Sequence, residues 1–185
     1  MPLHNPTQIV LDAKKLVESG RRSEIRLKAN GGNSILIRCE PMMELEYINK
    51  LIELLPAENF SIIDLNQCLM DYVSNTGPEL EELYNLLQSS TQEIFKAPAG
   101  EDSNDLYKEI LHQIDKALKD KKVPVLIKTG ALYGTGIHNI HIMESGTVMN
   151  ADLPLLILYP ATIEQDQILF LGKQPSSKYR CYIIP

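Results

Sequence analysis

The chain has 185 residues, of which 44% are hydrophobic and 23% charged, and its net charge is -6. The composition is too apolar for an intrinsically disordered protein, and the length suits one domain that buries about two thirds of its unfolded surface. Acidic residues concentrate in residues 41–120, which carry sixteen acidic and five basic side chains. Because affinity for a nucleic-acid backbone comes from Lys and Arg, this acidic middle disfavours direct nucleic-acid binding and leaves a basic protein partner open. Charges that simply solvate exposed helix faces account for the same pattern.

Cysteine spacing and apolar run length bear on the cellular compartment. The three cysteines, Cys39, Cys68 and Cys181, have no C-x-x-C spacing, so we expect buried free thiols and neither a disulfide framework nor a zinc site. No apolar run approaches the roughly 20 residues that span a bilayer, and the amino terminus lacks a basic region followed by an apolar one. We therefore expect a cytoplasmic protein without membrane contact.

The amino-terminal part predicts one short amphipathic helix over residues 7–20. Thr7 is its expected N-cap and Gly20 its expected stop. The basic segment 21–33 follows, and a loop or a short edge strand fits it equally well. Residues 1–30 are thus expected to form an amino-terminal helix and basic segment ahead of a core over residues 34–185.

A strand, helix, strand pattern occupies residues 34–66. The apolar run 34–40 predicts a buried strand that stops at Pro41, and residues 44–55 place apolar side chains at helical spacing. A second short strand is expected over residues 59–66, followed by a helical turn or two. This pattern predicts parallel pairing of the two strands with a right-handed crossover.

The middle of the chain is expected to be helical. A helix is predicted over residues 77–97, because Pro78 suits a first helical turn and acidic residues favour its positive dipole end. The clearest helix of the sequence is predicted over residues 105–122, with Leu106, Ile110 and Ile114 facing inward.

The carboxy-terminal third returns to strands. Continuous apolar runs at 123–130 and 153–160 predict central strands covered on both faces, joined by a short crossover helix within residues 137–150. Residues 167–173 and 179–185 are expected to form a closing pair. The whole predicts a single α/β domain over residues 1–185, with a mostly parallel sheet of five or six strands and helices on both faces.

Three glycines, Gly130, Gly134 and Gly136, follow the strand at 123–130 and raise the question of a phosphate-binding loop. A P-loop needs a lysine and a hydroxyl directly after its last glycine, and both are missing here. A dinucleotide fingerprint needs a third glycine where Asn139 stands, and an acid at the end of the next strand, which instead ends in Tyr159 and Pro160. We expect a turn or flexible loop and no cofactor. The alternative function is a nucleotide-binding or sensing enzyme that uses residues 130–136.

Other chemical motifs are weak. His138 and His141 are three residues apart but lack the third ligand of a metal site. The sequence has no G-x-S-x-G motif and no strong cysteine–histidine pairing, so we expect no catalytic residues and no enzyme. Asp64 is predicted at a strand end, where α/β enzymes often place active residues and where polar caps also belong.

A candidate partner contact lies near the carboxyl terminus. Lys173, Lys178, Tyr179 and Arg180 combine basic and aromatic groups in one short segment. Tyr and Arg are enriched at protein contact hot spots, which favours an interaction surface. An exposed hairpin with ordinary solvating charges accounts for the same residues, and both interpretations stay open.

Short motifs follow one another in an order that matches a known family. They are Gly32 and Asn33 before a strand, Glu40 and Pro41 at its end, Thr129 and Gly130 after another strand, Tyr159 and Pro160 at the end of a third, Leu171, Gly172 and Lys173 in a turn, and Tyr179 and Arg180 in the last strand. In this order and spacing, over residues 30–185, the chain resembles the BrxB proteins of bacterial BREX (bacteriophage exclusion) phage-defence systems. It departs from the family pattern at Leu171 and Lys173, where the family has Phe and Arg, and in a shorter loop after Pro160.

The resemblance implies a small non-catalytic component of a multi-protein defence complex. BrxB-type proteins act alongside a PglZ-type alkaline-phosphatase-like protein, a large ATPase and a DNA methyltransferase. The family has no established catalytic residues, so none is carried over to this chain. We therefore expect an adaptor that binds other BREX proteins, the PglZ-type subunit first, with a homodimer also open.

Overall fold

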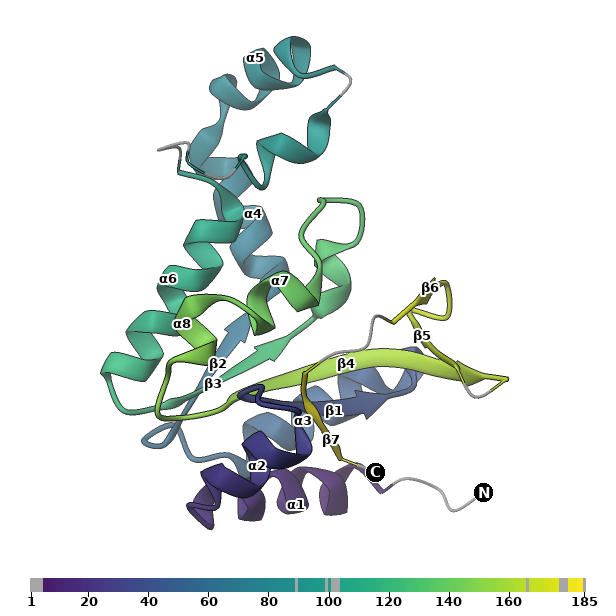
Figure 1. Ribbon diagram of the computed structural model, residues 1–185. Helices are drawn as coiled ribbons and strands as arrows, with labels where there is room; N and C mark the ends of the chain where they lie inside the picture. Colours follow the sequence, from purple (N-terminus) through teal and green to yellow (C-terminus); the bar gives the residue numbers. More distant parts are fainter. Residues whose placement is uncertain are drawn as a thin grey trace.

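The computed structural model describes residues 5–88, 90–98, 100, 104–165, 167–176 and 180–184. Five strands pair in parallel in the order β2-β3-β4-β1-β7, and a small antiparallel extension of β5 and β6 continues from β4 (Figure 1). The described strands are β1 (Ser34–Cys39), β2 (Phe60–Asp64), β3 (Val123–Ile127), β4 (Leu155–Glu164), β5 (Gln167–Phe170), β6 (Gln174–Pro175) and β7 (Tyr182–Ile184).

Helices alternate with these strands, and several begin at a polar cap. The side chains of Asn5, Asp64 and Asp105 accept backbone hydrogen bonds at the starts of α1, α4 and α6, which satisfies donors that a helix start leaves unpaired. The described α-helices are α1 (Pro6–Glu18), α2 (Arg22–Lys28), α3 (Glu44–Leu54), α4 (Leu65–Thr76), α5 (Pro78–Leu86), α6 (Leu106–Lys119), α7 (Asn139–Met143) and α8 (Gly146–Met149). The short 3-10 turns are η1 (Pro41–Met43), η2 (Thr91–Ile94) and η3 (Thr129–Leu132).

The sheet is covered by helices on both faces, as the continuous apolar runs predict. Successive strand residues point to opposite faces, so Ile35 and Ile37 of β1 pack with α1 and α3, whereas Leu36 packs with α4, α6 and the pair α7 and α8. All residues of β3 are buried. The α/β class with a mostly parallel sheet is therefore confirmed, with seven described strands where five or six were expected.

Two predicted strand pairings are wrong. The strands β1 and β2 are parallel but not adjacent, because β3 and β4 lie between them. The expected closing pair of 167–173 with 179–185 does not form either: β5 pairs with β4, and β7 lies alongside β1 at the other side of the sheet. Strand propensity is a local property, whereas strand order is decided by which apolar faces the helices can cover.

Several helices also differ from the prediction. The basic segment expected as a loop or edge strand contains the helix α2, whose Ile25 is 2% exposed and packs into the core beside β1. The helix predicted over residues 77–97 ends at Leu86 and is followed by η2, while the turn or two expected after β2 is the twelve-residue helix α4. The crossover within residues 137–150 is two short helices, α7 and α8.

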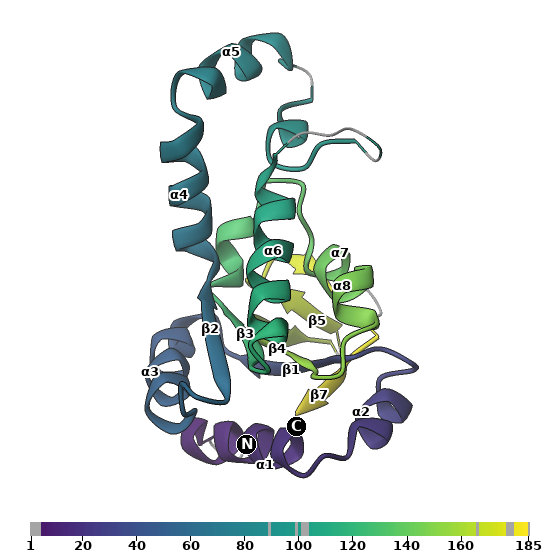
Figure 2. The same cartoon turned by 90° about the vertical axis from the view of Figure 1, so that its left-hand side faces the viewer.

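The helices α4, α5 and η2 form an arm that stands away from the sheet (Figures 1 and 2). The helix α4 begins where β2 ends and runs beyond the carboxyl edge of the sheet, and α5 crosses at its far end. The chain returns to the sheet through α6. None of the residues of α5 is buried, so this helix is the most exposed part of the arm.

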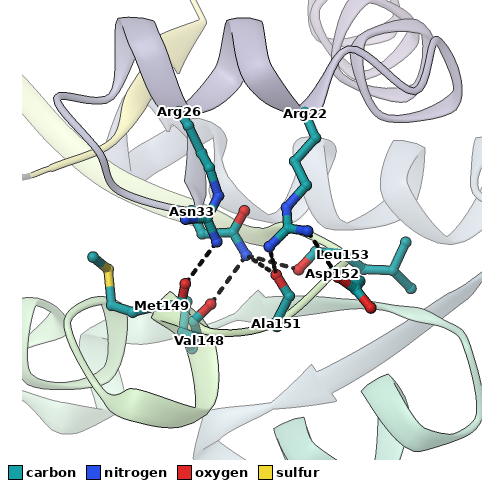
Figure 3. A network of polar contacts seen from close by, with 8 residues as sticks. All are labelled: Arg22, Arg26, Asn33, Val148, Met149, Ala151, Asp152 and Leu153. Atoms are coloured by element: carbon teal, nitrogen blue, oxygen red, sulfur yellow. Dashed lines mark hydrogen bonds and ion pairs between the residues drawn. The ribbon is translucent and has the colours of Figure 1, made fainter.

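A polar network joins the amino-terminal segment to the core (Figure 3). Asn33 is fully buried, and its amide nitrogen lies 3.0–3.1 Å from the carbonyl oxygens of Val148, Ala151 and Leu153. Two arginines of α2 add to it, because Arg26 donates to the carbonyl of Met149 and Arg22 donates to the carbonyl of Ala151 and pairs with Asp152. No later helical turn offers hydrogen-bond donors to the carbonyl groups at and after the end of α8. These carbonyl groups instead accept hydrogen bonds from the arginines of α2 and from Asn33, the residue before β1.

No helix in the described part of the chain combines the length and the apolar character needed to cross a membrane.

Candidate functional site

The carboxyl edge of the parallel sheet is where α/β proteins place ligands, and here it carries an ion pair. Asp64 ends β2, and its Oδ1 accepts a hydrogen bond from the backbone N–H of Gln67, which caps α4. Its Oδ2 lies 2.6 Å from the Nζ of Lys128, the first residue after β3. Of the two roles weighed for Asp64 from the sequence, the structure shows the polar cap, and it adds an ion pair at the sheet edge.

Lys128 has an unusual backbone conformation. Its φ and ψ are 55° and 42°, in the left-handed region that non-glycine residues seldom adopt. The strand β3 ends one residue earlier, so Thr129 and Gly130, expected at the strand end, lie in η3. The buried hydroxyl of Thr129 donates to the carbonyl oxygen of Leu158 at 3.1 Å and fastens this turn to β4.

Glu44 completes the charged group at this edge. It begins α3, and burial raises the pKa of its carboxyl group above its ordinary value; the Lys128 ammonium opposes this shift and the Asp64 carboxylate adds to it. The ion pair joins the start of α4 to the residue before η3, whereas Glu44 interacts with these two residues through charge alone.

The glycine loop encloses little space. Gly134 and Gly136 adopt positive φ angles of 88° and 77°, and a Cβ on Gly136 would lie 2.8 Å from the Cβ of Gln92. Backbone conformation and close packing therefore require glycine at position 136. The cavity beside the loop has a volume of about 90 Å³ and is bordered by Phe170 and Gln174 on the opposite side. Pockets for small-molecule ligands are usually about 300–1,000 Å³, so this cavity is too small for a nucleotide as it stands.

The two histidines contact each other at the start of α7. Their ring centroids are 5.2 Å apart, and the Nδ1 of His141 accepts a hydrogen bond from the backbone N–H of His138. Burial, followed by the Lys96 ammonium and the His138 ring, lowers the pKa of His141. Within the described ranges, no three His, Cys, Asp or Glu side chains come together as metal ligands.

The candidate contact segment near the carboxyl terminus is only partly described. Lys178 and Tyr179 lie outside the described residues. Lys173 is exposed in the turn between β5 and β6, whereas Arg180 is exposed just before β7, with its Nε 3.8 Å from Glu144 Oε1. Lys173 and Arg180 therefore lie next to different strands of the sheet. Their role in partner binding stays a prediction.

The arm carries an exposed apolar groove that the sequence analysis did not identify. The groove has a volume of about 530 Å³ and runs between α5 and η2. Leu80 and Tyr84 line it from α5, and Ile94 and Phe95 line it from η2 and the residue after it. Tyr84 is 58% exposed, although an aromatic side chain of this size is usually largely covered.

The two elements that form the groove are rich in acidic residues. Residues 65–95 contain five acidic residues and no lysine or arginine, and four of the five, Glu79, Glu81, Glu82 and Glu93, lie on α5 or η2. All four side chains are exposed, and none forms an ion pair with another described residue. The charge pattern is visible in the sequence, but the groove exists only once α5 and η2 lie side by side.

Three comparisons with known proteins bear on identity. The chain matches no protein-family model, no curated protein and no solved structure. The resemblance to BrxB proteins therefore stays a prediction.

Proposed function

We propose that this protein is a non-catalytic adaptor of a BREX-type anti-phage system, which binds a partner subunit, the PglZ-type protein first, in the cytoplasm. The observation that carries the adaptor role is the arm, which presents an uncovered apolar groove and exposed acidic side chains that form no ion pair with other described residues. Exposed apolar surface rimmed by polar residues is typical of protein interaction sites. The assignment to a BREX system rests on the motif order given above.

The roles of the motif residues support a protein that works through its surface. Asn33 is fully buried and binds three carbonyl groups, Thr129 fastens η3 to β4, and Tyr159 is fully buried and stacks on Phe170 with ring centroids 4.8 Å apart. Each of these residues stabilises the scaffold. Folding thus accounts for these three motif residues, and we expect partner binding to use exposed residues instead.

Copurification tests this function. The tagged protein is expressed with its neighbouring genes, isolated under mild salt, and its partners are identified by mass spectrometry. We expect a PglZ-type protein to be recovered in stoichiometric amount, and not with an unrelated tagged protein of similar size and charge. Recovery of the tagged chain alone, with the neighbouring gene products present in the lysate, would contradict the proposal.

A further inference from the structure

We infer that the groove between α5 and η2 binds a basic amphipathic helix of a partner protein, with the helix's apolar stripe in the groove and its Lys or Arg side chains against the acidic rim. This inference rests on the proposed adaptor function and adds to it the docking surface and the chemistry of its partner. Three features of the groove support this inference: its anchoring on α4, its shape and the charge near it.

The floor of the groove is held in place without a partner. Tyr72 of α4 donates a hydrogen bond from its hydroxyl to the carbonyl oxygen of Ile94 at 2.7 Å, and its ring lies 6.1 Å from that of Phe95. Ile94 is 5% exposed, so η2 is anchored on α4 while α5 stays uncovered. A preformed apolar surface binds with less loss of conformational entropy than one that must first order itself.

The shape of the groove suits a helix. Leu80 and Tyr84 are four residues apart on α5 and therefore lie on one side of it, facing the η2 side chains. A helix that lies along such a groove inserts apolar residues at spacings of three and four. The described residues that line the groove belong to helical elements or lie next to them, and none belongs to a strand that an extended peptide could pair with.

Charge identifies the kind of partner. Glu81 lines the groove from α5, and the exposed Glu93 lies on η2 next to the lining residue Ile94, so a bound helix would meet one carboxylate in the groove and a second close to its other wall. A second cavity of about 560 Å³ lies between the arm and α6 and is lined by Asp71, Glu79 and Glu109; among the described residues, no lysine or arginine lines either cavity. Nucleic acid and anionic membranes are repelled by such a surface, and so is the arm of a second copy. A basic helix is attracted to it.

Two synthetic peptides provide a direct test of this inference. Both have eighteen residues with leucines at helical spacing; one has lysines at all other positions and the other has glutamates. Binding of each labelled peptide to the full-length protein is measured by fluorescence anisotropy at low and at physiological ionic strength. We expect the lysine peptide to bind, with an affinity that falls as salt rises, and the glutamate peptide not to bind.

Matched variants locate the site. The double variant E81K/E93K reverses the charge of Glu81, which lines the groove, and of Glu93, which lies beside it on η2; E46K/E58K makes the same change in net charge at exposed positions outside the arm. We expect E81K/E93K to weaken lysine-peptide binding by about tenfold or more and E46K/E58K to leave it within about twofold. Tyr84→Ser should weaken it several-fold, whereas Tyr133→Ser, at a tyrosine that is 54% exposed elsewhere, should not.

Some outcomes of the peptide and variant experiments would contradict the inference. Equal weakening by E46K/E58K and E81K/E93K, or equal binding of the glutamate peptide, would overturn the inference. A dimer that sedimentation detects and that E81K/E93K abolishes would show that the occupant is a second copy.

If partners copurify as well with E81K/E93K as with the unmodified protein, the docking surface is wrong while the adaptor function stands. If the peptide binds as expected but no partner is ever recovered, the adaptor function fails and the groove assignment stands.

Discussion

The Lys128 ammonium lies 2.6 Å from the Asp64 carboxylate, and this contact joins the turn after β3 to the start of α4. The two residues are 64 positions apart in the chain. Lys128 makes this contact from a left-handed backbone conformation, with φ 55°. Its side chain is therefore stabilising while its backbone is strained, and the two contributions can be separated by mutation.

We expect Lys128→Ala to lower the free energy of unfolding by up to about 1 kcal/mol, because it removes the ion pair and keeps the strain. Lys128→Gly removes the pair and relieves the strain, so it should be about 1 kcal/mol more stable than Lys128→Ala. Urea unfolding followed by circular dichroism measures both. Equal stability of the two variants would argue against a strained backbone at this position.

Lys121 offers a control for this comparison. It has φ 58° directly after the C-cap of α6, where glycine is favoured, and its side chain is exposed. The backbone N–H groups of Lys121 and Lys122 bind the carbonyl oxygens of Leu118 and Ala117, the pattern of a Schellman motif. Lys121→Gly should therefore raise stability by up to about 1 kcal/mol in the same assay.

The buried amide of Asn33 should be one of the most sensitive positions of the fold. Asn33→Asp replaces a donor by a carboxylate that faces the carbonyl oxygens of Val148, Ala151 and Leu153. We expect a loss of about 3 kcal/mol or more at neutral pH, larger than that of Asn33→Ala. The same change at Asn49, which is exposed on α3, should shift the urea midpoint very little. A small effect of Asn33→Asp would contradict the buried network.

Gly31 and Gly32 are adjacent glycines with different constraints. A Cβ on Gly32 would collide with the backbone carbonyl group of Arg180, whereas a Cβ on Gly31 meets no atom within 4 Å but has a positive φ of 86°. We expect Gly31→Ala to cost about 1 kcal/mol through backbone strain, and Gly32→Ala to cost about 3 kcal/mol because the backbone before β7 must move. Chemical unfolding of the two variants checks the ranking, and the reverse order would rule out the close approach.

The thiol of Cys181 should make the protein sensitive to alkaline pH. Burial raises its pKa from 9.0 to about 12. Below pH 9 the thiol is neutral in both states and its contribution to stability is complete. Between pH 9 and 12 only the unfolded state ionises, so the free energy of unfolding falls by about 1.4 kcal/mol for each pH unit. Stability measured from pH 8 to 11 should therefore fall less steeply for Cys181→Ala than for the unmodified protein, and identical slopes would refute the shift.

Much of the secondary structure was predictable because its causes lie within a few residues. The apolar run of β3 and the inward stripe of α6 at Leu106, Ile110 and Ile114 were recognised from the sequence, and all of them are buried. The missing lysine and hydroxyl of the glycine loop also needed no structure. Besides the helix errors at α2, α4 and α5, the errors concern strand partners: β1 pairs with β4 and β7, more than 100 residues further along the chain, and no local pattern indicates this.

The sequence by itself determined the α/β class, the main helices and central strands, and the acidic charge of residues 65–95. Only the tertiary structure decided that α2 is a helix whose arginines reach carbonyl groups after α8, that Asp64 meets Lys128, and that α5 and η2 enclose an apolar groove. The physical reason is the range of the forces. Periodicity, caps and turns arise from neighbours within one helical turn or strand, whereas buried polar partners and grooves depend on which distant surfaces the hydrophobic core brings together.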